Sequence, residues 1–158
     1  MPTTEELRLD RSRQAFLAEV ARRVRSSLAA VDFAGILDTL IEWSNADGRS
    51  LSVRDPLHEH KVSFASTASG YVLWSAYPRN DDGAKVVVLP KLFRGITSTN
   101  RQILLKKLKV AVPTVKIEGS GTLQVPMHLL TAHRATIGFR ALLDAASDIA
   151  NSYGSRRQ

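Results

Sequence analysis

The amino-acid sequence predicts an α+β domain in which a central antiparallel meander of three to four strands is flanked by helices. Apolar residues recur at helical spacing in the first and last parts of the chain, whereas β-branched and aromatic residues gather between residues 51 and 90. Turn-forming residues separate the clusters in that middle region. Because the strands are grouped and do not alternate with helices, we predict the element order α-α-β-β-β-α-β-α.

Two helices are expected before the strands. Thr4, followed by Glu5 and Glu6, is typical of a helix start and predicts a helix over residues 4–30. Asp32 predicts the cap of a second helix, which continues to about Asn45, where a turn begins. The expected buried stripes are Phe16, Leu17, Val20, Val24 and Leu28 on the first helix, and Phe33, Ile36, Leu37, Leu40 and Ile41 on the second.

The strands follow in the middle of the chain. Residues 85–89 contain three consecutive valines and predict the clearest strand, which Pro90 ends. Strands are also expected at 62–65 and 71–77, and residues 51–53 predict a weaker one. We expect helices to cover one face of this sheet and the other face to be available to a partner.

Helical spacing returns at residues 97–112, where Thr97, Ser98 and Thr99 are candidate caps and Pro113 ends the helix. The residues expected to face inward are Ile103, Leu104, Leu108 and Val112, and those expected to point the other way are Gln102, Lys106 and Lys109. Short strands are expected at 115–117 and 122–125. A long helix over 126–153 then precedes a frayed tail at 154–158. We assign residues 1–153 to a single domain, because 158 residues are enough for one core.

The composition narrows the class of protein. There is no cysteine, so disulfides and cysteine-ligated zinc are excluded. No apolar run approaches the roughly 18 residues that a membrane span needs, and the N-terminal residues do not have the pattern of a signal peptide. We therefore expect a small soluble protein that works in the cytoplasm without contacting membranes.

The charge is distributed unevenly. Of the net charge of +7, the stretch between Asp82 and Glu118 supplies eight basic residues and no acidic one, and the remainder is nearly neutral. A local excess of this kind predicts a positive surface that attracts polyanions. The candidate nucleic-acid-binding cations are Arg79, Lys85, Lys91, Arg94, Arg101, Lys106, Lys107 and Lys109, with Lys116 just beyond them.

Three aromatic residues lie on one predicted strand. Strand alternation places Tyr71, Leu73 and Tyr77 on one face and Trp74 on the other. Tyr71 and Tyr77 are therefore candidates for stacking on nucleic-acid bases. The alternative is that Trp74 belongs to the core and that the tyrosines fill the edge of the sheet.

A polar segment offers an alternative chemistry. It contains Asp55, His58, Glu59, His60 and Lys61, in which Glu59 and Lys61 have the spacing of the acidic-x-Lys element of many metal-dependent nucleases. The second acid that such a site needs is not evident on a preceding strand, and the segment is also typical of a polar loop. No phosphate-binding loop, dinucleotide fingerprint or hydrolase elbow is present. We therefore assign no catalytic residue, no metal and no cofactor.

Together these features predict a non-catalytic nucleic-acid-binding domain that contacts the phosphate backbone of DNA or RNA. One alternative is a protein-interaction module, an adaptor or inhibitor, that uses the same lysines to bind an acidic protein partner. Another is a small metal-dependent nuclease built on the segment at 55–61. The sequence leaves the oligomeric state open, and a homo-oligomer is compatible with it.

Overall fold

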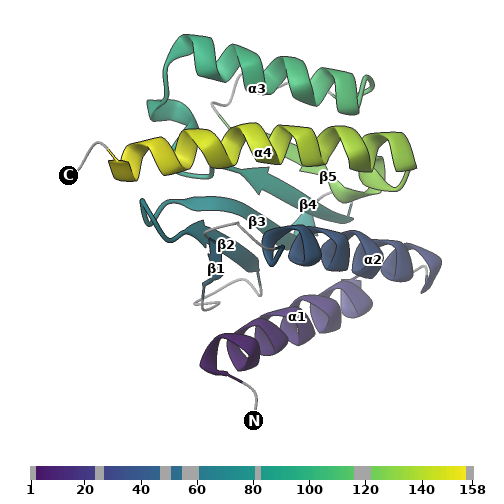
Figure 1. Cartoon of the computed structure of the whole chain (residues 1–158). Coiled ribbons are helices and arrows are strands. Elements are labelled where there is room, and N and C mark those ends of the chain that lie inside the picture. Colours follow the sequence, from purple (N-terminus) through teal and green to yellow (C-terminus); the bar gives the residue numbers. More distant parts are fainter. Residues whose placement is uncertain are drawn as a thin grey trace.

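The computed structural model describes residues 3–23, 27–46, 51–54, 61–80, 83–115 and 122–155. This part of the chain forms an α+β fold with a five-stranded antiparallel sheet (Figure 1). The helices are α1 (Thr4–Arg23), α2 (Ser27–Ser44), α3 (Ser98–Ala111) and α4 (His133–Ser155), with short 3₁₀ helices η1 (Phe93–Gly95) and η2 (Met127–Leu130). The strands are β1 (Leu51–Val53), β2 (Val62–Ser66), β3 (Val72–Asn80), β4 (Gly83–Val88) and β5 (Leu123–Pro126). The predicted fold class is confirmed, but the sheet has five strands where three to four were expected, because the strand predicted at 122–125 joins it as β5.

The first two helices differ from the prediction at their boundaries. Thr3, one residue before the expected cap, accepts a hydrogen bond from the Glu6 backbone N–H at 3.0 Å and so caps α1. Helix α2 begins at Ser27, which places Asp32 inside it and not at its start. No local signal indicates this division, because residues 24–31 contain neither glycine nor proline and continue the helical spacing.

The strand order in the sheet follows the sequence order from β1 to β5. The weak strand at 51–53 is confirmed and pairs with β2, whereas β5 returns after α3 to pair with β4 at the opposite edge. The predicted strand at 115–117 is not found in its described part, since Val115 lies outside any strand. β3 continues to Asn80, past its predicted end at Tyr77. The β3–β4 register shifts between these two residues, where Pro78 has no N–H to donate.

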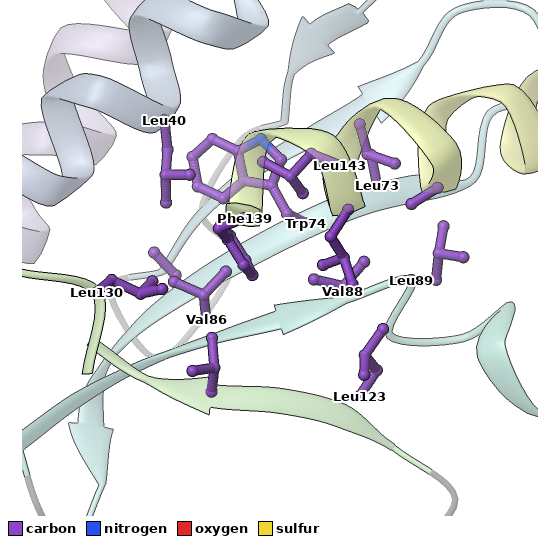
Figure 2. Packing of buried hydrophobic residues seen from close by; sticks show 14 of the residues in the cluster. Leu40, Leu73, Trp74, Val86, Val88, Leu89, Leu123, Leu130, Phe139 and Leu143 are labelled. Atoms are coloured by element: carbon purple, nitrogen blue, oxygen red, sulfur yellow. The ribbon is translucent and has the colours of Figure 1, made fainter. Parts of the chain in front are cut away.

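Cross-strand pairing assigns residues to the two faces of the sheet. Phe64, Trp74 and Val88 lie side by side on β2, β3 and β4, and Val86 is on the same face. We call this the Trp74 face. Figure 2 shows Leu40 of α2 together with Phe139 and Leu143 of α4 packed over this face. The alternate residues Ser75, Tyr77, Lys85 and Val87 define the opposite surface, which we call the Tyr77 face.

A β-bulge changes the alternation predicted for β3. The β2–β3 register shifts between Phe64 and Ala65, so that Leu73 points toward α4 together with Trp74 (Figure 2). Tyr71 also contacts α4, because its ring meets that of Tyr153 edge-on at a centroid distance of 6.0 Å. The prediction that Tyr71, Leu73 and Tyr77 share a face is therefore wrong.

Helix α3 packs mainly on α4. Thr97 caps α3, as one of the predicted alternatives, by accepting a hydrogen bond from the Asn100 backbone N–H at 3.1 Å. Leu104 and Leu108 are buried as expected, but Ile103 is 42% exposed and lies on the outer side of the helix. The final helix is also shorter than predicted, because η2 occupies the first residues of the expected span.

α3 and α4 approach each other closely at a glycine. A Cβ atom added to Gly138 would lie 2.6 Å from the Cβ of Ala111 and 2.7 Å from its Cα. Gly35, in the middle of α2, is the opposite case, because a Cβ added there would meet no atom within 4 Å. The same substitution should therefore have opposite effects at these two positions.

We predict that Gly138→Ala lowers the free energy of unfolding by roughly 1–3 kcal/mol, since the added methyl group forces α3 and α4 apart. Gly35→Ala should raise it by up to about 1 kcal/mol, because alanine favours the helix and nothing obstructs its methyl group. Urea unfolding followed by circular dichroism measures both changes. Equal stability of the two variants would show that the α3–α4 contact is not as close as described.

Candidate nucleic-acid interface

The predicted cations fall into two groups on different parts of the fold. Lys85 lies on the Tyr77 face of β4, whereas α3 packs on α4, which covers the other face. Lys91 and Arg94 are exposed in the segment that joins β4 to α3. The structure therefore does not bring the basic residues of this stretch together in one continuous row.

The group on the Tyr77 face is centred on one tyrosine ring. The Nζ atom of Lys85 lies 5.6 Å from the ring centroid of Tyr77, and the Nζ atom of Lys61 lies 5.5 Å from it. These are cation–π distances. Lys85 Nζ also donates to the Gln124 Oε1 atom at 3.3 Å. Two predicted candidates, Lys85 and Tyr77, are thus in contact, and Lys61 joins them from outside the predicted set.

The second group lies on the outer face of α3, which we define by Thr99, Gln102, Ile103, Lys106 and Lys109. These residues follow one another at helical spacing, all are exposed, and together with Leu105 they line a shallow groove of about 550 Å³. Near the C-terminal end of α3, Lys109 Nζ donates to the carbonyl oxygen of Val115 at 3.5 Å. From Gly83 to Val115 the chain has no carboxylate, so no acidic side chain of this segment offsets the two lysines.

Other predicted cations are less available for a ligand. Arg101 is half-buried, and its Nη1 donates to the carbonyl oxygens of Arg94 and Ile96, each at 3.1 Å. It therefore ties η1 to the first turn of α3. Lys107 is half-buried on the side of α3 next to the buried residues Leu104 and Leu108. These two residues are the weakest members of the predicted set.

Several predicted residues cannot be placed in the site. Arg79 belongs to β3, but its side chain is not among those the structure describes, and Lys116 lies outside the described residues. The acidic and histidine members of the metal-site alternative, Asp55, His58, Glu59 and His60, also lie outside them. Among the residues that are described, no group of three or more histidine, aspartate or glutamate side chains could hold a metal ion.

Sequence reasoning missed Lys61 and Gln124 as members of these surfaces, whereas it predicted Gln102 on the same side of the helix as Lys106 and Lys109. Gln102 was recognisable from its spacing of four residues before Lys106. Lys61 and Gln124 were not, because only the pairing of β2 with β3 and of β4 with β5 brings them beside Tyr77 and Lys85.

Comparison with protein-family models, curated proteins and solved structures finds no match for this chain. None of the helices in the described segments is long and apolar enough to cross a membrane. A function for this chain is therefore inferred from the geometry and charge of the molecule itself.

Arg101 and Lys106 should respond differently to neutralisation. We predict that Arg101→Gln lowers the free energy of unfolding by about 1–2 kcal/mol, since two carbonyl oxygens lose a charged donor. Lys106→Gln should leave stability nearly unchanged, because that side chain is exposed and makes no described hydrogen bond. Chemical unfolding of both variants tests this. If the Arg101→Gln variant were as stable as the wild type, Arg101 would again be a candidate for ligand binding.

Proposed function

We propose that the protein binds nucleic acid by its phosphate backbone, and that the outer face of α3 makes the main contact. The observation that supports this most is the exposure of Lys106 and Lys109 on one helix face within a segment that has no carboxylate. Phosphate binding requires cations that are spaced along a surface and have long, mobile side chains. Gln102 and Thr99 add neutral hydrogen-bonding groups beside them.

Two further exposed cations precede the helix in the chain. Lys91 and Arg94 are exposed just before α3, and the positive end of the helix dipole lies next to them at the Thr97 cap. No described set of side chains on this face is suited to hydrogen bonding with base edges. We therefore propose that binding is independent of nucleotide sequence. A cytoplasmic location, expected from the sequence, would give the protein access to nucleic acid.

Charge reversal on α3 tests the proposal. Lys106→Glu/Lys109→Glu should weaken binding of labelled single- and double-stranded DNA and RNA by roughly tenfold or more at low salt. It should also reduce the slope of log affinity against log salt by about two, since two phosphate contacts are lost. Fluorescence anisotropy over a salt series measures both quantities, and circular dichroism checks that the fold is retained.

A matched control separates a local contact from the effect of net charge. Arg11→Glu/Arg134→Glu removes the same four units from the net charge of +7, but at exposed positions on α1 and α4. This control should keep near wild-type affinity. If both double variants lose affinity equally, binding depends on overall charge and the α3 interface is wrong. If the wild-type protein binds none of the four nucleic acids at low salt, the proposed function is wrong.

A second candidate function is supported by apolar side chains on the same helix. Ile103 is 42% exposed beside Lys106, and Val110 is 68% exposed beside Lys109. A phosphate backbone would not bury these two apolar side chains, whereas an acidic protein whose binding surface has an apolar centre would bury them. An adaptor or inhibitor that binds such a partner is therefore the alternative to nucleic-acid binding.

A variant that keeps the charges tests whether these apolar side chains take part in nucleic-acid binding. Ile103→Ser/Val110→Ser should leave nucleic-acid affinity and its salt dependence unchanged if phosphates are the ligand. Loss of nucleic-acid binding in this variant, with the fold intact, would contradict a purely electrostatic contact. The anisotropy measurement used for the lysine variants decides between these results.

A further inference from the structure

A cavity of about 420 Å³ lies between α2 on one side and η2 with the start of α4 on the other. Figure 2 shows three of its lining residues, Leu40, Leu130 and Phe139, converging from these elements. Its volume is in the range of small-molecule sites in proteins, which are typically about 300–1,000 Å³. None of its lining residues belongs to the α3 interface, so it is a separate feature of the molecule.

A glycine is among the residues that line this cavity. Gly35 is exposed in the middle of α2, where glycine costs roughly 0.5–1 kcal/mol relative to alanine. At Gly138 the close contact with α3 explains the glycine, but a Cβ at Gly35 would meet nothing. Internal packing therefore does not account for Gly35, and the absent side chain leaves room for a ligand to enter.

The threonine hydroxyl groups that line the cavity already donate hydrogen bonds within the protein. Thr39 donates its proton to the carbonyl oxygen of Gly35 at 2.9 Å, and Thr136 donates to that of Leu130 at 3.0 Å. Thr131 likewise donates to the carbonyl oxygen of His128 at 3.2 Å. Because each hydroxyl proton is already used, the lone pairs that remain favour a ligand with a donor group such as an ammonium.

Two side chains of opposite charge lie on the two walls of the cavity. Asp32 is exposed on α2, and Arg140 is exposed on α4. In the described part of the chain neither side chain takes part in an ion pair. A ligand that fits would therefore present an apolar body to Ile36, Leu40 and Phe139, an ammonium to Asp32 on the α2 wall and an anion to Arg140 on the α4 wall.

We propose that this cavity binds a free apolar amino acid, or a small zwitterion of the same chemistry. Its ammonium group would face Asp32, and its carboxylate would accept hydrogen bonds from Arg140. Its side chain would be buried against the apolar floor. A peptide bound through its interior lacks both charges and would not satisfy the site.

Titration calorimetry on the full-length protein tests the proposal with L-leucine, L-phenylalanine and L-tryptophan as probes. At least one should bind, and its N-acetyl and amide derivatives should bind at least about tenfold more weakly, since each lacks one charge. The absence of binding by all three up to about 10 mM, where a millimolar site would be largely filled, would overturn the proposal. Equal binding of the blocked derivatives would also overturn it, and would indicate an apolar pocket without charge recognition.

Variants localise the site. Gly35→Leu should abolish binding by filling the cavity, whereas Glu42→Leu adds the same side chain to an exposed position of α2 outside the cavity and should not affect binding. Arg140→Gln and Asp32→Asn should each weaken binding roughly tenfold without filling the space. Because these two variants do not fill the cavity, they test the site even if Gly35→Leu does not fold. Wild-type affinity in both would show that the probe binds elsewhere.

Discussion

The arrangement of this molecule depends on the burial of Trp74. Its side chain is fully buried, and its ring stacks on Phe64 at a centroid distance of 5.3 Å and an interplanar angle of 22°. The indole N–H donates to the Ser44 hydroxyl at 2.8 Å, and that hydroxyl donates in turn to the Leu40 carbonyl oxygen. A buried N–H without a partner costs about 1–3 kcal/mol, so this chain of hydrogen bonds favours a defined position of the end of α2 over the sheet. One residue thereby joins β2, β3 and α2.

The two candidate sites both follow from how the helices are placed around this core. α4 packs over the Trp74 face, and α3 packs on α4 through the contact of Gly138 with Ala111. Because α4 occupies the apolar stripe of α3, the lysines of α3 remain on its outer side. α2 lies on the other side of α4, tied to α1 by a bidentate ion pair between Arg13 and Asp38, with distances of 2.7 and 3.0 Å. The cavity lies between α2 and the start of α4.

Much of the fold could be predicted from the sequence, but the candidate site only in part. Thr97 as a helix cap and residues 51–53 as a strand were predicted, because caps and β-propensity depend on a few adjacent residues. The position of Lys106 and Lys109 on one helix face also follows from their spacing. The inclusion of Arg101 in that surface is less well supported, because its bonds to backbone carbonyls depend on how η1 folds back onto α3. Nothing in the local sequence indicates such a contact.

The sequence by itself determined the type and order of the elements and the concentration of positive charge between Asp82 and Glu118. Only the tertiary structure decided which surfaces those elements share. Three features depend on contacts between elements that are distant in the sequence. They are the bulge that turns Leu73 to the side of Trp74, the contact of Lys61 with Tyr77, and the cavity between α2 and α4. The physical reason is range: propensities and caps act over a few residues, whereas strand register and helix packing are set by contacts between segments far apart in the chain.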